Sequence, residues 1–299
     1  ELMLRSGNDN KVVRLLHGRA RSNAKKIVFA EADHLDVLKA AQIVHEEGIA
    51  EPILLGRKDI ILELKKELEF DADIAIIDPM SDEFDERRER NYFGAMMVLE
   101  GDADGMVSGY SRAYPTVVKP ILEVIGRASG VKKVATVNIM ITERGPLFLA
   151  DTSINIEPNA EELADIAQMT ANVASTFGFD PVLAMLSYAN FGSSTHPNAT
   201  KVREAVRILH ETAPNLVVDG EIQTDFALNK ELHESKFPFS KLAGRKVNTL
   251  IFPNLESSNI TYKLLKELNG ADSIGPIMVG LRKAVHIMQL GASGDEIVN

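Results

Sequence analysis

The sequence contains no cysteine. This absence excludes a disulfide framework, a zinc site built on thiolates and a cysteine nucleophile, and it fits a reducing cytoplasm. No apolar run approaches the roughly 20 residues that a membrane-spanning helix needs. No signal peptide precedes the first polar segment. We therefore expect a cytoplasmic protein that has no membrane partner.

The chain has fewer basic than acidic residues: 33 lysines and arginines against 43 aspartates and glutamates, which gives a net charge of -10. A negative field repels phosphodiester backbones and anionic membrane surfaces. We therefore expect no nucleic-acid partner.

The motifs of several enzyme classes are also missing. The chain has no Gly-x-Gly-x-x-Gly after a predicted strand, no Walker A loop and no Gly-x-Ser-x-Gly elbow. Its seven histidines are scattered without a His-x-x-x-His pair, so we expect no metal site.

The 299 residues, 45% of them apolar, are enough for two α/β domains. The apolar patterns predict strands at 25–30, 52–56, 74–77, 104–109, 134–141, 145–150, 181–187, 216–220 and 247–252. They predict helices at 35–47, 58–68, 91–100, 115–125, 160–177, 200–211 and 258–268. Residues 1–23 are expected to form a helix or linker. The alternation of strand and helix up to residue 77 predicts right-handed βαβ units and a parallel sheet. The strands at 134–141 and 145–150 look like a pair around residues 142–145.

Small and polar residues follow several of the predicted strands, in loops at 108–111, 151–155, 187–194, 219–223 and 274–280. Ligands of parallel α/β proteins bind at the carboxyl ends of strands, and these loops offer hydroxyls and backbone N–H groups. Five such loops together predict a cleft for a polar, phosphorylated ligand. For Ser193 and Ser194, a role in capping the following helix is an equal alternative.

These loops, in combination and order, resemble the phosphate acetyl/butyryltransferase family over residues 25–299. The stretches that carry the resemblance are 103–109, 150–155 with Pro158, 184–188, 218–221, 250–256, 259–263 and 274–276. The resemblance implies two three-layer α/β domains with a cleft between them, and a dimer. Residues 25–136 with 279–299 would form domain I, residues 137–278 domain II, and residues 1–24 a linker.

Two stretches, 190–194 and 283–290, look more like the C-terminal transacetylase-like domain of multidomain NADP-dependent malic enzymes. This likeness implies that the chain is a fragment that follows a malic enzyme region, where NADP and a divalent metal would bind; the fragment itself would hold no cofactor. The ends of the chain, at Glu1 rather than Met and at Asn299, agree with that expectation.

The departures from the transferase pattern concern the proposed catalytic residues. Active transacetylases resemble one another in a Ser-Arg pair that is followed, six residues after the Arg, by Asp. At the corresponding positions this chain has Gln289, Leu290 and Glu296. The resemblance implies that the Ser hydroxyl donates to the oxyanion, that the Arg pairs with phosphate, and that the Asp helps to deprotonate the thiol of coenzyme A. Leu290 cannot pair with phosphate. Acetyl transfer is therefore expected to be lost or very slow.

A further departure lies between Arg87 and Asn91. The malic enzyme subgroup usually has a longer helical excursion there. Either this loop is short, or residues are missing between Arg90 and Asn91.

Three hypotheses remain at this point. The first is a regulatory domain of a cytoplasmic malic enzyme that oxidises malate to pyruvate and CO2; the domain binds acetyl-CoA or a related acyl-CoA as an allosteric effector and supports a homodimer within a higher oligomer. The second is an active phosphate acetyltransferase or butyryltransferase. The third is an oligomerisation domain without a ligand. The expected ligand contacts are Ser108, Gly109, Ser111, Thr152, Asn155, Ser193, Ser194, Gly275, Pro276 and Arg282.

Overall fold

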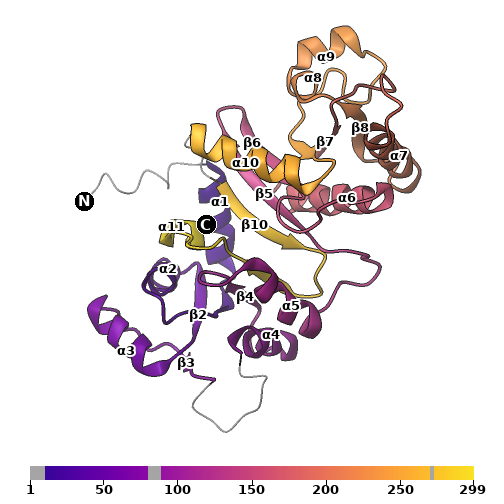
Figure 1. Cartoon of the computed structure of the whole chain (residues 1–299). Helices are drawn as coiled ribbons and strands as arrows, with labels where there is room; N and C mark the ends of the chain where they lie inside the picture. The colour runs from indigo at the N-terminus through magenta and orange to yellow at the C-terminus, as the bar shows by residue number, and fades with distance from the viewer. Residues whose placement is uncertain (1–10, 80–88, 270–272) are drawn as a thin grey trace. The chain divides into compact units, whose positions relative to one another are not determined.

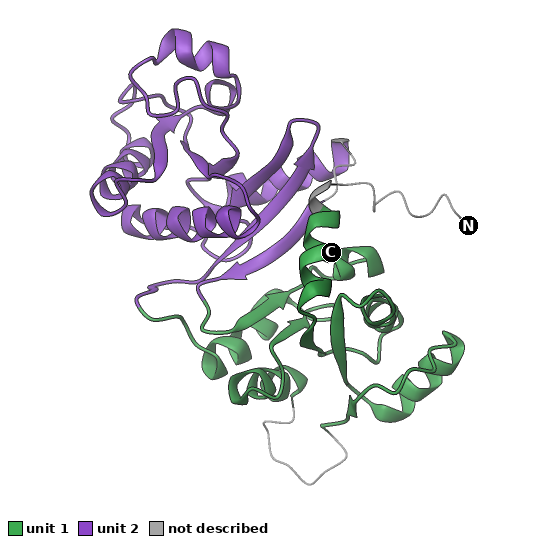
Figure 2. Ribbon diagram, turned by 180° about the vertical axis from the view of Figure 1, so that it is seen from behind, with its two compact units in different colours: residues 1–129, 281–299 green, residues 130–280 purple. Residues whose placement is uncertain are grey.

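The computed structural model of the chain describes residues 11–79, 89–269 and 273–299. The chain divides into two compact units, one of residues 1–129 with 281–299 and one of residues 130–280 (Figure 2). The boundaries expected from the sequence lie at 136/137 and 278/279. Each unit contains its own sheet. The mixed α/β class is therefore as predicted, whereas the cleft expected between the domains stays a prediction.

The sheet of the first unit has five parallel strands in the order β11-β4-β1-β2-β3. They are β1 (Lys25–Phe29), β2 (Ala50–Leu55), β3 (Ile76–Ile77), β4 (Gly105–Ser108) and β11 (Ala284–Ile287). The last strand was not predicted from the sequence. It comes from the C-terminal segment and pairs with β4, so two distant parts of the sequence become neighbours.

Helices cover both faces of this sheet. Phe29 and Leu54 pack with α2 (Leu35–Glu46) and α3 (Lys58–Glu67). Leu55, the next residue on β2, points to the opposite face. There a Cβ at Gly94 of α4 (Arg90–Glu100) would lie 3.4 Å from Leu55 Cδ2. Helix α5 (Tyr114–Val124) packs on α4, and α11 (Gly294–Val298) packs on α2. Helix α1 (Lys11–Ser22) precedes β1 (Figure 1).

The sheet of the second unit has the order β10-β5-β6-β9-β7-β8. Its strands are β5 (Ala135–Thr142), β6 (Gly145–Ala150), β7 (Val182–Leu186), β8 (Val217–Ile222), β9 (Thr249–Ile251) and β10 (Ser273–Val279). Strands β6, β9, β7 and β8 are parallel, but β5 runs antiparallel to both β6 and β10. The strand pair predicted at 134–141 and 145–150 is therefore confirmed as an antiparallel hairpin, β5–β6, which turns at residues 142–145.

Two of the predicted loops are strands in this unit. Residues 274–280 fall largely in β10, whose register with β5 shifts between Ile274 and Ile277. Gly275 and Pro276 lie at this irregularity. Because Gly-Pro is typical of turns, the sequence pattern predicted a loop here and not a strand. Residues 219–222 likewise continue β8 and do not follow it.

Helices also cover both faces of the second sheet. Phe148 of β6 packs edge-on against Phe177, which directly follows α6 (Ala160–Thr176). The neighbouring Leu149 points to the other face and shares a core with Tyr262 of α10 (Leu255–Asn269). The remaining helices of the unit are α7 (Pro197–Thr212), which packs on α6, α8 (Thr224–Leu228) and α9 (Lys230–Lys236).

Helix starts follow local capping chemistry. Asn159 and Glu162 form a reciprocal capping box at the start of α6. Helix α7 begins at Pro197, three residues earlier than predicted, and its N-cap is His196, whose ring accepts from the N–H of Asn198. The capping role considered for Ser193 and Ser194 is therefore wrong. The charged segment that follows Asp78 lies mostly outside the described residues. No helix in the described ranges is long and apolar enough to cross a membrane.

Candidate functional site

The carboxyl ends of β4 and β11 bring together two loops that are about 180 positions apart in the sequence. The backbone N–H of Met288 donates to Ser108 O at 2.7 Å, and that of Gly291 donates to Tyr110 O at 3.0 Å. We call this place the β4–β11 edge, formed by residues 108–111 and 288–292. It contains Ser108, Gly109 and Ser111 from the predicted ligand contacts, together with Gln289 and Leu290.

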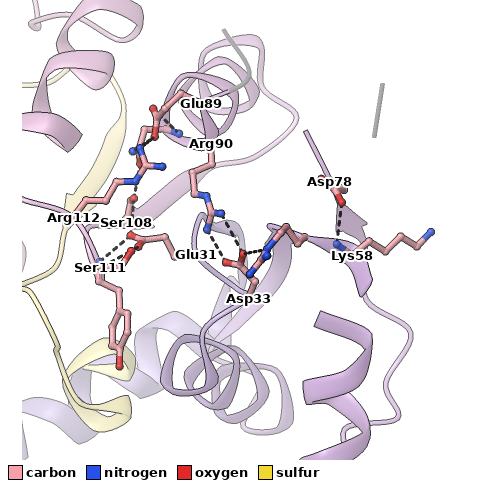
Figure 3. Close-up of polar contacts among 12 residues, drawn as sticks. Glu31, Asp33, Lys58, Asp78, Glu89, Arg90, Ser108, Ser111 and Arg112 are labelled. Carbon is pink, nitrogen blue, oxygen red and sulfur yellow. Dashed lines mark hydrogen bonds and ion pairs between the residues drawn. The ribbon is translucent and has the colours of Figure 1, made fainter. Parts of the chain in front are cut away.

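The carboxylate of Glu31, just after β1, organises the first of these loops. It is buried and accepts from the backbone N–H groups of Gly109, Tyr110 and Ser111 at 2.7, 2.8 and 2.9 Å, and from the Ser111 hydroxyl (Figure 3). Burial alone would raise the pKa of Glu31, but the hydroxyl and the three N–H groups hold it below its ordinary value. Glu31 is therefore an anion at neutral pH, and it occupies the N–H groups that the sequence analysis assigned to a ligand.

Ser108 and Gly109 have structural reasons for their identity. The Ser108 hydroxyl is buried and donates to Asn91 Oδ1 at 2.5 Å. Gly109 has a φ of 102°, and a Cβ there would lie 2.7 Å from Ile287 Cγ2. Only glycine fits this approach between β4 and β11. Both residues therefore have structural roles in the loop that follows β4.

Of the side chains at the proposed catalytic positions, Leu290 and Glu296 are exposed and Gln289 is half-buried. Leu290 is 71% exposed at the β4–β11 edge. Glu296 lies on α11, where its Oε2 accepts from the Ser293 backbone N–H at 2.9 Å and from the Ser293 hydroxyl at 3.2 Å. A substrate that approaches Leu290 thus meets an apolar side chain. Oε2 of the Glu296 carboxylate takes part in a capping box with Ser293.

A second polar place at the carboxyl edge of this sheet is a cavity of about 340 Å³ next to the ends of β2 and β3. Its lining residues are Gly56, Arg57, Asp78, Pro79, Glu89, Arg90 and Arg112. We call it the arginine cavity. Guanidinium groups suit phosphate and carboxylate ligands, and no residue of this cavity was predicted as a contact. The available signal was Arg57, which follows the strand end at Gly56.

The arginines of this cavity are paired with carboxylates (Figure 3). Arg90 donates to the two carboxylate oxygens of Asp33 at 2.6 and 3.2 Å, and Arg112 donates to Glu89 at 2.6 Å. Burial would raise the pKa of Asp33, but Arg90 holds it below its ordinary value. An anion in the cavity would have to compete with these carboxylates, so the cavity is a weaker site than its charge suggests.

Arg282 does not line the arginine cavity. Its Nε donates to Ile125 O, and its backbone N–H donates to Gly126 O at 3.2 Å. These bonds tie the segment before β11 to the end of α5. The ligand role expected for Arg282 stays a prediction beside this structural one.

In the second unit, Thr152 and Asn155 are buried around Asp151. The Asp151 carboxylate accepts from the N–H of Thr136 at 2.9 Å and from that of Asn155 at 2.7 Å. The Thr152 hydroxyl accepts from Asn138 Nδ2 at 2.8 Å. A Cβ at Gly275 would lie 2.8 Å from Asn138 Oδ1. Asn138, Asp151, Thr152 and Asn155 thus lie in the interior of the unit. Gly275 is exposed, and Pro276, the next residue of β10, is buried.

Ser193 and Ser194 belong to a different network. Ser193 Oγ accepts from the Asn190 N–H at 2.9 Å, and Ser194 Oγ lies 3.0 Å from the Tyr188 hydroxyl. The loop is anchored by Glu221, which is fully buried and accepts from the Gly192 N–H at 2.8 Å.

Arg203 completes this anchor. Its Nε and Nη2 donate to the two oxygens of Glu221 at 3.1 and 3.0 Å. Burial would raise the pKa of Glu221, but the ion pair holds it below its ordinary value.

Removal of this cation is expected to destabilise the second unit. Arg203→Met keeps the stem and leaves the buried Glu221 without its ion-pair partner, so the free energy of unfolding should fall by about 2 kcal/mol at neutral pH, less than for a fully buried pair because Arg203 is partly exposed. The matched control on the same helix is Arg207→Met, which breaks only exposed ion pairs and should change stability by less than about 0.5 kcal/mol. Equal losses in urea denaturation of the two variants would contradict this account.

The profile of the family described as phosphate acetyl/butaryl transferase matches residues 11–89 and 85–299. The chain belongs to the phosphate acetyl/butyryltransferase family. It is 39% identical to a phosphate acetyltransferase of Thermoanaerobacterium thermosaccharolyticum over 318 aligned positions, which cover 96% of each protein. The crystal structure of a phosphotransacetylase from Streptococcus pyogenes superposes with a TM-score of 0.88 at 38% identity, covering 96% of this chain and 95% of that one.

Malic enzymes are relatives too. The NADP-dependent malic enzyme of Haemophilus influenzae is 34% identical over 96% of this chain, which spans 42% of that enzyme's length. The transferases thus match over their whole length and the malic enzymes over a part. The comparisons therefore favour the transferase hypothesis over the malic enzyme hypothesis.

The comparisons also bear on the segment between Arg87 and Asn91. The two matched stretches of the family profile meet at residues 85–89. The 318 aligned positions exceed the 299 residues of the chain, so the Thermoanaerobacterium protein has residues that this chain lacks.

Proposed function

We propose that the chain binds acetyl-CoA and catalyses a slow transfer of the acetyl group between coenzyme A and phosphate. The observation that carries this proposal is the full-length match to phosphate acetyltransferases. By the resemblance, Gln289 and Leu290 on the β4–β11 edge and Glu296 on α11 stand at the positions of the family's Ser, Arg and Asp. An acyl-CoA and phosphate are then the two ligands.

The chemistry proposed for this edge follows from those side chains. In the direction of acetyl-CoA synthesis, the thiolate of coenzyme A attacks the carbonyl carbon of acetyl phosphate, and the tetrahedral intermediate expels phosphate. Glu296 takes the thiol proton as a general base, and the Gln289 amide donates to the oxyanion. Leu290 supplies no donor to the phosphate. Complete loss of an oxyanion donor lowers a rate by about 10²–10³, so replacement of the family's Ser by the longer Gln289 amide slows the transfer by up to that factor. Loss of the guanidinium slows it further.

A calorimetric titration with acetyl-CoA, combined with an assay of acetyl phosphate and coenzyme A, tests the proposal. We expect acetyl-CoA to release heat on binding, and we expect thioester to form slowly above the rate without protein. The natural control is Glu296→Gln, which keeps the size of the side chain and removes the base. Turnover that does not change in Glu296→Gln would contradict the assigned role.

A second candidate function is favoured by the same three residues. A chain in which Gln289 and Leu290 replace the family's oxyanion and phosphate partners is suited to sense acetyl-CoA without turning it over, as a regulatory domain of a malic enzyme. NADP and a divalent metal would then bind outside these 299 residues. Binding of acetyl-CoA without any turnover supports this function, whereas the absence of heat would leave only a structural role in assembly.

A further inference from the structure

Arg112 joins the arginine cavity to the β4–β11 edge. It directly follows Ser111, and it lines the cavity. The Gly291 N–H donates to Tyr110 O at 3.0 Å. The segment that carries Leu290 therefore lies against the loop that leads into Arg112. The Arg112 side chain is 38% exposed, so a ligand that binds at the edge has access to its charge.

One ion pair holds the guanidinium of Arg112 and leaves most of its donors over. Its Nη1 donates to Glu89 Oε1 at 2.6 Å (Figure 3). Glu89 is itself fixed, because it accepts from the backbone N–H and the side-chain amide of Asn91 at 3.1 and 2.6 Å. A guanidinium carries five N–H donors, and this bond uses one of them. Arg112 is therefore held in place with donors that remain for a further anion.

The other arginines of the cavity are less suited to a ligand at the edge. Arg90 uses both of its Nη groups on the carboxylate of Asp33. Arg57 follows β2, which is separated from β4 by β1. Arg112 follows β4 itself, the strand that pairs with β11. Position and bonding thus favour Arg112 as the cation of the edge.

The proposed transfer needs a cation beside the phosphate, and Leu290 does not provide one. The Glu31 carboxylate, which the loop after β4 surrounds, adds a negative charge near the edge. A phosphate that binds there is repelled by this carboxylate unless a cation compensates. A guanidinium suits this purpose, because its fork of N–H donors matches the spacing of phosphate oxygens.

We propose that Arg112 binds the phosphate that the transfer uses, in place of the arginine that the family has where this chain has Leu290. The inference rests on the proposed function for the identity of the ligand, which is inorganic phosphate or the phosphate group of acetyl phosphate. Glu89 competes with this ligand for the guanidinium and so lowers the affinity of the site. A purely structural Arg112 would only hold Glu89 at the start of α4.

Titration with inorganic phosphate, followed by phosphorus NMR, measures binding without turnover. Arg112→Met should raise the dissociation constant for phosphate by about tenfold or more, because a charge-assisted bidentate contact is lost. Arg112→Lys keeps the charge without the fork, so its constant should lie between those of the natural chain and Arg112→Met. The matched control is Arg21→Met, which removes an arginine of the same unit that is paired with Glu47 at 2.6 Å. This control should leave the constant unchanged.

Glu89→Gln separates a ligand role of Arg112 from a structural one. The substitution removes the carboxylate that competes for the guanidinium, while the amide oxygen can still accept from the Asn91 N–H. Phosphate should therefore bind about two- to fivefold more tightly, as expected for release of a partly exposed ion pair. A structural role predicts no gain in affinity, because the start of α4 would only lose a bond.

A double-variant cycle in the transfer assay connects the site to the reaction. Arg112→Met should raise the KM for phosphate in the natural chain. In the Leu290→Arg background its effect should be smaller, because two guanidinium groups then share one phosphate. Effects that simply add would assign the two side chains to different anions and would contradict the proposal.

Two further outcomes would overturn it. One is a natural chain that binds no phosphate, or binds it as tightly as Arg112→Met does. The other is a loss in Arg112→Met that is confined to coenzyme A, titrated in parallel by calorimetry, because Arg112 would then bind a phosphate of the nucleotide. Failure of the proposed function is a separate result. A chain that binds phosphate through Arg112 but forms no thioester contradicts the transfer and not the site.

Discussion

A double variant, Gln289→Ser with Leu290→Arg, is expected to raise the rate of acetyl transfer by about 10²-fold or more. The serine hydroxyl replaces a longer amide as the donor to the oxyanion. The arginine provides a fork of N–H donors for the phosphate, in place of an aliphatic side chain. Both changes stabilise charge that develops in the transition state, so we expect the gain mainly in kcat.

Because of the position of Leu290, the substitution should change activity without changing stability. Because its side chain is 71% exposed, an arginine there meets solvent and requires no repacking of the core. The free energy of unfolding should therefore change by less than about 0.5 kcal/mol, and activity can be compared without a correction for folding.

The controls separate charge from shape. Leu290→Met keeps an apolar side chain of similar volume and should leave the slow rate unchanged. Leu290→Arg alone should lower the KM for phosphate more than it raises kcat, since the oxyanion donor is still the longer Gln289 amide. If the double variant turns over no faster than Leu290→Met, the β4–β11 edge is not the place of transfer. The regulatory function would then be preferred.

The sequence predicts most of the framework because the buried strands are short apolar runs bounded by helices of clear periodicity. Strands β1 and β2 and helices α2, α3 and α6 lie within two residues of the expected bounds at each end. The prediction fails where local chemistry and tertiary pairing disagree. Strand β10 contains Gly275 and Pro276, and its pairing with β5 outweighs their preference for turns.

The candidate site was less accessible to sequence analysis. Ser108, Gly109 and Ser111 were expected to contact a ligand, and they do lie together at a strand end. What the sequence did not reveal is the anion that occupies their backbone N–H groups, because Glu31 lies 78 positions before Gly109. A carboxylate after a strand looks the same in a sequence whether it turns to solvent or into the sheet edge.

Substitution of Glu31 should therefore lower the free energy of unfolding more than most single substitutions in this chain. Glu31→Ala leaves the buried N–H group of Gly109, and the partly buried ones of Tyr110 and Ser111, without their acceptor. Each unsatisfied buried donor costs about 1–3 kcal/mol, so the free energy of unfolding should fall by about 3 kcal/mol or more. Glu51→Gln, at an exposed position on β2, is the control and should stay within about 0.5 kcal/mol of the natural chain in urea denaturation.

The conservative variant Glu31→Gln distinguishes charge from shape through its pH dependence. The pKa of Glu31 is below its ordinary value of 4.5 in the folded chain, so the carboxylate stabilises the fold above that value. The stabilisation is lost as the pH falls through the lowered pKa, because the folded state must then take up a proton at a site that four donors surround. Glutamine cannot titrate. The difference in unfolding free energy between the natural chain and Glu31→Gln should therefore be largest at neutral pH and shrink below about pH 4.5. A difference that stays constant across this range would mean that the loop depends on the shape of residue 31 and not on its charge.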